Sequence, residues 1–89
     1  MTEREVTIVN SLGLHARPAA QLVRLASGFA ADIELSNLDG LAVNAKSIMG
    51  VMMLAAEQGS RIKVRAVGPD AEDAVNAMAQ LVADGFGES

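Results

Sequence analysis

Residues 13–19 read Gly13-Leu14-His15-Ala16-Arg17-Pro18-Ala19 and contain the single histidine of the chain. Proline is tolerated in the first turn of a helix, because the N–H group that it lacks would have no partner there. We therefore predict a helix over residues 19–27, ended by Gly28. His15 should then lie at or just before the N-terminus of this helix.

The start of this predicted helix is suited to binding an anion. The first backbone N–H groups of a helix have no partner inside it, and together they carry about half a positive charge. A phosphoryl group on His15 would meet these donors, and Arg17 could add a charge-assisted hydrogen bond. A histidine at a helix start can equally be an ordinary surface or capping residue. The residue types alone leave both interpretations open.

Two stretches resemble the HPr family, the histidine-containing phosphocarriers of the bacterial phosphotransferase system. Residues 13–19 look like the active-site motif of that family, and Lys46-Ser47-Ile48-Met49-Gly50-Val51-Met52 resembles its regulatory-serine region. The separation of the two motifs, the chain length and the order of elements also match, so the resemblance covers essentially the whole chain. One departure is Leu12, which stands where the family commonly has a small polar residue.

The resemblance implies a phosphoryl carrier that has no turnover of its own and needs neither cofactor nor metal. His15 would accept the phosphoryl group on Nδ1 from enzyme I, which takes it from phosphoenolpyruvate. The phosphate would then pass to an enzyme IIA domain of a sugar permease. Arg17 would neutralise charge on the phosphate, and the backbone amides of Ala16 and Arg17 would bind it.

Ser47 precedes an apolar helical pattern and is a natural N-cap residue, which by itself would explain its presence. The resemblance adds that this serine is phosphorylated in many relatives by an HPr kinase/phosphorylase. A helix N-terminus would tolerate such a phosphate. The sequence leaves open whether Ser47 is regulated in this way.

The segment after Ser47 is more apolar than one short helix can bury. We expect Val51 and Leu54 to lie in the core and Ile48, Met49 and Met52 to form an exposed patch, since methionine-rich surfaces adapt to several partners. The alternative is that methionines at helical spacing simply belong to the core. The resemblance places the docking surface for partners on two helices, at Ala20, Arg24, Ile48, Met49 and Met52.

Composition limits the function classes. The chain has 89 residues, a net charge of −4, two phenylalanines as its only aromatics, and no cysteine. We expect one HPr-like domain over residues 1–89. Acidic charge and scarce aromatics argue against nucleic-acid binding, and one histidine without cysteine argues against a structural zinc site. With no signal peptide and no long apolar run, we expect a cytoplasmic protein that does not insert into membranes. We also expect it to be a monomer.

Hydrophobic periodicity predicts strands at residues 5–9, 31–38, 41–45 and 61–67. Helical patterns lie between strands at 19–27 and after Ser47. A third helical pattern follows the last strand, from Asp70, the expected cap, to Gly85. Four strands with three helices on one face form a two-layer, open-faced α+β sandwich with the order β-α-β-β-α-β-α. On the first helix we expect four residues to face the core: Ala19, Ala20, Val23 and Ala26. Residues 86–89 are expected to form a frayed tail.

The charges on the open face of the sheet indicate its strand order. The fourth predicted strand, residues 61–67, exposes basic side chains, whereas the first exposes Glu5 and the second exposes Asp32 and Glu34. Opposite charges on neighbouring strands stabilise a sheet, and like charges opposite each other destabilise it. The fourth strand should therefore lie between the first and second. This gives an antiparallel sheet of order 1-4-2-3, which the family resemblance also implies.

Two alternative functions remain open from the sequence. The chain could be a nitrogen-branch paralogue of HPr, with the same histidine and regulatory partners. It could also be a regulatory binding module that never carries phosphate, with His15 as a capping residue. A ferredoxin-like enzyme is disfavoured, because the sequence has no clustered carboxylates or cysteines to support catalysis.

Overall fold

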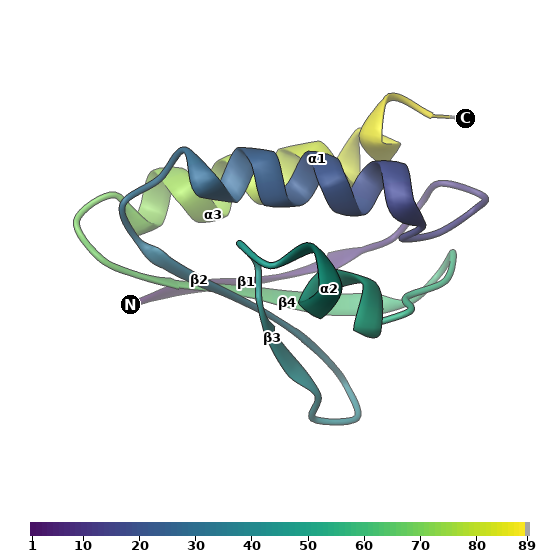
Figure 1. Ribbon diagram of the computed structural model, residues 1–89, viewed down its shortest axis with the longest axis horizontal. Coiled ribbons are helices and arrows are strands. Elements are labelled where there is room, and N and C mark those ends of the chain that lie inside the picture. The colour runs from purple at the N-terminus through teal and green to yellow at the C-terminus, as the bar shows by residue number, and fades with distance from the viewer. Residues whose placement is uncertain (89) are drawn as a thin grey trace.

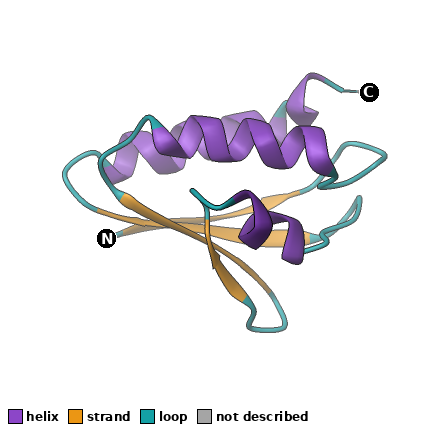
Figure 2. Cartoon of the chain, in the orientation of Figure 1, coloured by secondary structure: helices purple, strands orange, loops and turns teal. Residues whose placement is uncertain are grey.

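The computed structural model describes residues 1–88 (Figure 1). Its elements follow the predicted order and are β1 (Thr2–Thr7), α1 (Ala16–Ser27), β2 (Asp32–Asn37), β3 (Ala42–Asn44), α2 (Ile48–Met53), β4 (Arg61–Val67), α3 (Ala71–Ala83) and the 3-10 turn η1 (Gly85–Gly87). Figure 2 shows the strands as one layer and the two long helices, α1 and α3, as a second layer above it. The predicted open-faced α+β sandwich is confirmed.

The four strands form one antiparallel sheet of order β1-β4-β2-β3, as predicted. The cross-strand register brings the expected charges together: Glu5 of β1 pairs with Lys63 of β4, and Glu34 of β2 pairs with Arg65 of β4. Arg61 also forms an ion pair with Glu5, with 3.4 Å between Nη1 and Oε1. The basic strand thus lies between two acidic ones.

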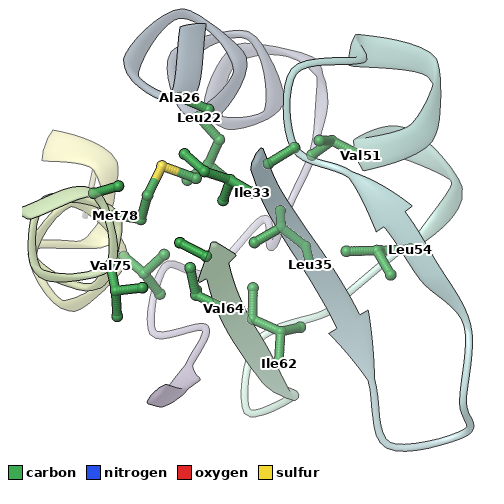
Figure 3. Packing of buried hydrophobic residues seen from close by; sticks show 14 of the residues in the cluster. Leu22, Ala26, Ile33, Leu35, Val51, Leu54, Ile62, Val64, Val75 and Met78 are labelled. Atoms are coloured by element: carbon green, nitrogen blue, oxygen red, sulfur yellow. The ribbon is translucent and has the colours of Figure 1, made fainter. Parts of the chain in front are cut away.

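The hydrophobic core lies between the sheet and the helices (Figure 3). Strand β4 alternates as predicted, with Ile62, Val64 and Ala66 buried. On α1 the prediction was partly wrong, because Leu22 is fully buried whereas Ala20 and Val23 are only half-buried. The buried residues of this helix are Pro18, Ala19, Leu22 and Ala26. Leu22 lies three residues after Ala19 and four before Ala26, which is the spacing of one helical face.

Strand β1 begins earlier than predicted, at Thr2 rather than at residue 5. Its pairing with β4 continues past the assigned end of the strand: the Ile8 N–H donates to the Ser60 carbonyl at 2.9 Å, and the Gly59 N–H donates to the Ile8 carbonyl at 2.7 Å. The charged residues near the start do not interrupt the strand, because their side chains lie exposed while the backbone pairs with β4.

The expectation of a frayed tail is wrong for residues 86–88, and Ser89 lies outside the described residues. Phe86 is only 4% exposed and packs in the core. Its backbone is left-handed at φ 58°, between Gly85 and Gly87, which are also left-handed. These two glycines turn the chain without a Cβ penalty, and burial of the aromatic ring stabilises the segment. As a result, the end of the described chain lies beside the start of α1 (Figure 1).

Asp70 occupies the N-cap position of α3 as predicted, but its side chain makes no capping hydrogen bond to that helix. Its two carboxylate oxygens instead accept hydrogen bonds from the N–H groups of Ala30 and Ala31, each at 2.8 Å. The Ala30 N–H, followed by that of Ala31, holds the pKa of the Asp70 carboxyl below its ordinary value. Asp70 therefore links the start of α3 to the segment that leads into β2.

None of the helices within residues 1–88 combines the length and apolar character needed to cross a bilayer.

Candidate functional site

His15 is the N-cap residue of α1, as the sequence predicted. Its backbone is extended, with φ −82° and ψ −171°, and its carbonyl accepts the first helical hydrogen bond from the Ala19 N–H at 3.0 Å. The next N–H groups, those of Ala16 and Arg17, belong to the first turn and have no partner inside the helix. A side chain that leaves the N-cap position therefore emerges next to two backbone donors at the positive end of a helix.

The loop before His15 is fixed by contacts with the segment that follows α2. Gly13 has a left-handed φ of 67°, which favours glycine. The N–H of the buried Leu14 then donates to the carbonyl of Ala56 at 2.8 Å. These contacts fix the point from which α1 starts, so the position of His15 is set by the packing of the core.

Glu88 contacts the histidine directly, which the sequence did not predict. Nε2 of His15 lies 3.0 Å from both carboxylate oxygens of Glu88. The imidazole hydrogen bond, followed by that from Asn10, holds the pKa of the Glu88 carboxyl below its ordinary value. The His15 side chain is 35% exposed and that of Glu88 is 16% exposed. The site is thus half-buried and contains a carboxylate from the far end of the described chain.

Asn10 connects the histidine loop to Glu88 and was also missed. It is only 2% exposed, and its Nδ2 donates to the Gly13 carbonyl at 2.7 Å and to Oε1 of Glu88 at 3.0 Å. The signal that could have indicated this arrangement is Phe86. An aromatic flanked by two glycines near the end of a chain with few aromatics is suited to anchoring that segment on the core.

Arg17 is exposed and, together with His15 and Glu88, lines an open surface depression that also includes Leu12. The positive charge of Arg17 contributes to lowering the pKa of Glu88. Leu12, the departure from the family pattern, is 74% exposed. His15, Ala16 and Arg17 therefore line one accessible depression at the start of α1.

Ser47 is the N-cap residue of α2, and this prediction is confirmed. Its Oγ accepts a hydrogen bond from the Gly50 N–H at 3.2 Å. Ser47 is half-buried, and the residues directly after it are exposed. A modification of Ser47 would thus alter the charge at the edge of an apolar surface.

The apolar surface on α2 divides as predicted, with Val51 and Leu54 buried and the other large side chains exposed. Ile48, Met49, Met52 and Met53 line a hollow together with Ala16, the residue next to His15; we refer to these five residues as the methionine patch. Met53, 64% exposed, is an addition to the predicted set. Of the two docking residues predicted on α1, Arg24 is exposed and Ala20 is half-buried.

Comparison with known proteins gives matches to one family over nearly the whole chain. A family model described as "PTS HPr component phosphorylation site" matches residues 2–84. The chain belongs to the HPr family of phosphocarriers. The phosphocarrier protein HPr of Cupriavidus necator is 49% identical over 88 residues, which cover 99% of this chain and 98% of that protein.

Two further matches extend the comparison to a solved structure and to a phosphocarrier named NPr. The crystal structure of an HPr from Thermoanaerobacter tengcongensis has a TM-score of 0.94 and 45% identity, covering 100% of this chain and 99% of that one. The phosphocarrier protein NPr of Escherichia coli K12 is 41% identical over 86 residues, covering 97% of this chain and 96% of NPr. The chain is therefore an HPr-type phosphocarrier of the phosphotransferase system, similar both to proteins named HPr and to one named NPr.

Proposed function

We propose that His15 accepts a phosphoryl group from enzyme I, originally from phosphoenolpyruvate, and passes it to an enzyme IIA domain of a sugar permease. In this proposal, residues 1–89 act as one HPr-like domain, as a monomer and in the cytoplasm. The protein is a carrier, since His15 returns to its starting state only through a partner.

One observation carries this proposal: the His15 side chain leaves the N-cap position of α1, beside Arg17 and the amides of Ala16 and Arg17. Backbone N–H groups at a helix N-terminus bind phosphate oxygens, and an arginine adds charge-assisted hydrogen bonds. The same groups would stabilise the charge that develops during transfer.

The methionine patch supports a docking role, because it borders the histidine through Ala16. Exposed apolar surfaces of this kind commonly mark protein interaction sites, and methionine side chains adapt to partners of different shape. We propose that enzyme I and the IIA domain both bind here, with contributions from Ala20 and Arg24 on α1.

We propose in addition that phosphorylation of Ser47 by an HPr kinase/phosphorylase regulates this docking. The hydroxyl lies at the N-terminus of α2, directly before Ile48 and Met49. A phosphate at this position adds roughly two negative charges beside the patch. Partners with acidic rims would then bind more weakly, while the helix itself would tolerate the modification.

A transfer assay tests the proposed function. The protein is phosphorylated with phosphoenolpyruvate and catalytic enzyme I, separated from them, and mixed with a purified IIA domain. We expect the phosphate to move from the protein to the IIA domain in a single transfer step. Failure of the wild-type protein to acquire phosphate would instead support a binding module in which His15 is only a cap.

A second candidate is the nitrogen-branch carrier, because the chain is also 41% identical to a protein named NPr, although its identity to HPr of Cupriavidus necator is higher at 49%. The same assay separates the two branches when the phosphorylated protein is offered a sugar-branch and a nitrogen-branch IIA domain in competition. Faster transfer to the sugar-branch domain supports our proposal, and faster transfer to the other domain supports the NPr-like role.

A further inference from the structure

We propose that Glu88 is a positioning residue for the phosphoryl acceptor: it binds the hydrogen on Nε2 of His15, so that Nδ1 presents its lone pair to phosphorus. This inference rests on the proposed function, in which His15 accepts the phosphate.

The geometry determines which ring nitrogen carries the hydrogen. Both oxygens of Glu88 lie 3.0 Å from Nε2. A carboxylate without a proton can only accept hydrogen bonds, so Nε2 must donate. A neutral imidazole has one N–H, and the hydrogen bond at one nitrogen determines the tautomer. With Nε2 protonated, the lone pair is on Nδ1.

The carboxylate is itself held in place from two directions. Asn10, which is nearly fully buried, donates from Nδ2 to Oε1 of Glu88 at 3.0 Å and to the Gly13 carbonyl at 2.7 Å. Two residues before Glu88, the buried ring of Phe86 anchors the segment on the core. Glu88 is therefore positioned by the fold, and its contact with His15 does not depend on a flexible tail.

The arrangement has a direct chemical consequence for transfer. The Nδ1 lone pair forms the N–P bond while the bond between phosphorus and the donor breaks, and that electron pair leaves with the donor. Nε2 keeps its hydrogen, so the ring becomes a phosphoimidazolium whose positive charge faces Glu88. In the onward step the N–P bond breaks, its electron pair returns to Nδ1, and a neutral imidazole leaves. No proton has to enter or leave the ring in either direction.

The comparable role in hydrolases belongs to the buried aspartate that orients a catalytic histidine and stabilises its imidazolium. Glu88 differs in that the histidine it orients gains and loses no proton during the reaction. It would fix the reactive tautomer before the donor binds and stabilise the positive charge after the phosphate arrives.

The test compares Glu88→Ala and Glu88→Gln with a matched control, Glu34→Gln. Glu34 is exposed on the open face of the sheet, away from the helices, and its substitution removes the same charge. Nuclear magnetic resonance of the imidazole nitrogens reports the tautomer directly, when the protein is unphosphorylated and the pH is high enough for the imidazole to be neutral. We expect the wild type and the control to carry the hydrogen on Nε2, and Glu88→Ala to shift toward a mixture in which Nδ1 is also protonated. Glu88→Gln, whose amide oxygen still accepts, should lie between them.

Single-turnover phosphorylation by enzyme I provides the second measurement. In metal sites, loss of the group that orients a ligating histidine costs about 10-fold to 100-fold in affinity or activity, and the same orienting role is proposed here for Glu88. We expect Glu88→Ala to slow uptake by this factor, Glu88→Gln to slow it less, and Glu34→Gln to leave it unchanged. A wild-type protein that takes up phosphate, with nitrogen spectra and rates unaltered in Glu88→Ala, would overturn the role of Glu88 alone. A wild-type protein that takes up no phosphate would overturn the proposed function, while the nitrogen spectra would still test the contact with Glu88.

Discussion

A Cβ atom added to Gly13 would lie 2.6 Å from the carbonyl oxygen of Ala56. The same oxygen accepts the hydrogen bond from Leu14, so this close approach joins the histidine loop to the segment after α2. The contact places the start of α1 next to the methionine patch. The proposed phosphate site and docking surface are thus connected by this backbone contact as well as through Ala16.

The first prediction concerns this contact. A left-handed backbone at a non-glycine residue costs about 1–3 kcal/mol. Gly13→Ala should destabilise the protein by more than this, because the new methyl group also meets the carbonyl of Ala56. Gly59→Ala is the matched control, since Gly59 has a φ of 90° but nothing within 4 Å of an added Cβ. Chemical denaturation of the two variants measures the difference, and equal losses of free energy would show that the close approach is relieved without cost.

The second prediction concerns Asp70, whose pKa is lowered chiefly by the Ala30 N–H. A carboxyl whose pKa is lower in the folded than in the unfolded state stabilises the fold above its ordinary value of 3.8, and this stabilisation is lost as the pH falls through the lower folded value. Asp70→Asn should therefore be less stable than the wild type at neutral pH, and the difference should shrink below pH 3.8.

Thermal melting of the wild type and Asp70→Asn from neutral to strongly acidic pH checks this. Asp39→Asn is the control, because Asp39 is exposed in the turn between β2 and β3. A stability difference between wild type and Asp70→Asn that stays constant down to the lowest pH would contradict the account.

The third prediction separates the two roles of Ser47. Ser47→Ala removes the cap of α2 and should cost about 0.5–2 kcal/mol of stability. Ser47→Asp keeps a capping oxygen but adds negative charge beside the methionine patch, so it should weaken enzyme I binding more than it changes stability. Calorimetric titration with enzyme I tests this, with Asn76→Asp, on the exposed side of α3, as the charge control. Unchanged affinity of Ser47→Asp would count against the electrostatic explanation.

The fourth prediction separates docking from packing within one segment. Met49 is 75% exposed, so Met49→Ala should change the free energy of unfolding by less than about 0.5 kcal/mol while it weakens enzyme I binding. Leu54 is only 5% exposed, and Leu54→Ala should cost about 2–5 kcal/mol. Denaturation and titration of both variants give the comparison. Wild-type affinity in Met49→Ala would remove this residue from the docking surface.

Local patterns in the sequence predicted most of the fold. Strand β4 was predicted with its observed bounds, because alternation is a local property of its seven residues. The strand order was predictable because the register places Glu5 opposite Lys63 and Glu34 opposite Arg65. The position of His15 was predictable because Pro18 restricts where the helix can begin.

The residues that were missed depend on contacts between distant parts of the chain. Glu88 reaches His15 across 73 positions, and the acceptors of the Ala30 and Ala31 amides lie on Asp70, 40 and 39 positions away. Hydrophobic periodicity is a local pattern and does not indicate which distant residues come into contact. The face of α1 was misjudged at Ala20 for a related reason, since alanine fits both a buried and a half-exposed position and its neighbours decide between them.

The most direct test of the central claim is the intact mass of the protein after incubation with phosphoenolpyruvate and enzyme I, measured for the wild type and for His15→Ala. We predict that the wild type gains one acid-labile phosphate and that His15→Ala gains none while it keeps a native melting profile. Phosphorylation of folded His15→Ala, or no gain of mass in the wild type, would contradict the assignment of His15 as the phosphoryl acceptor.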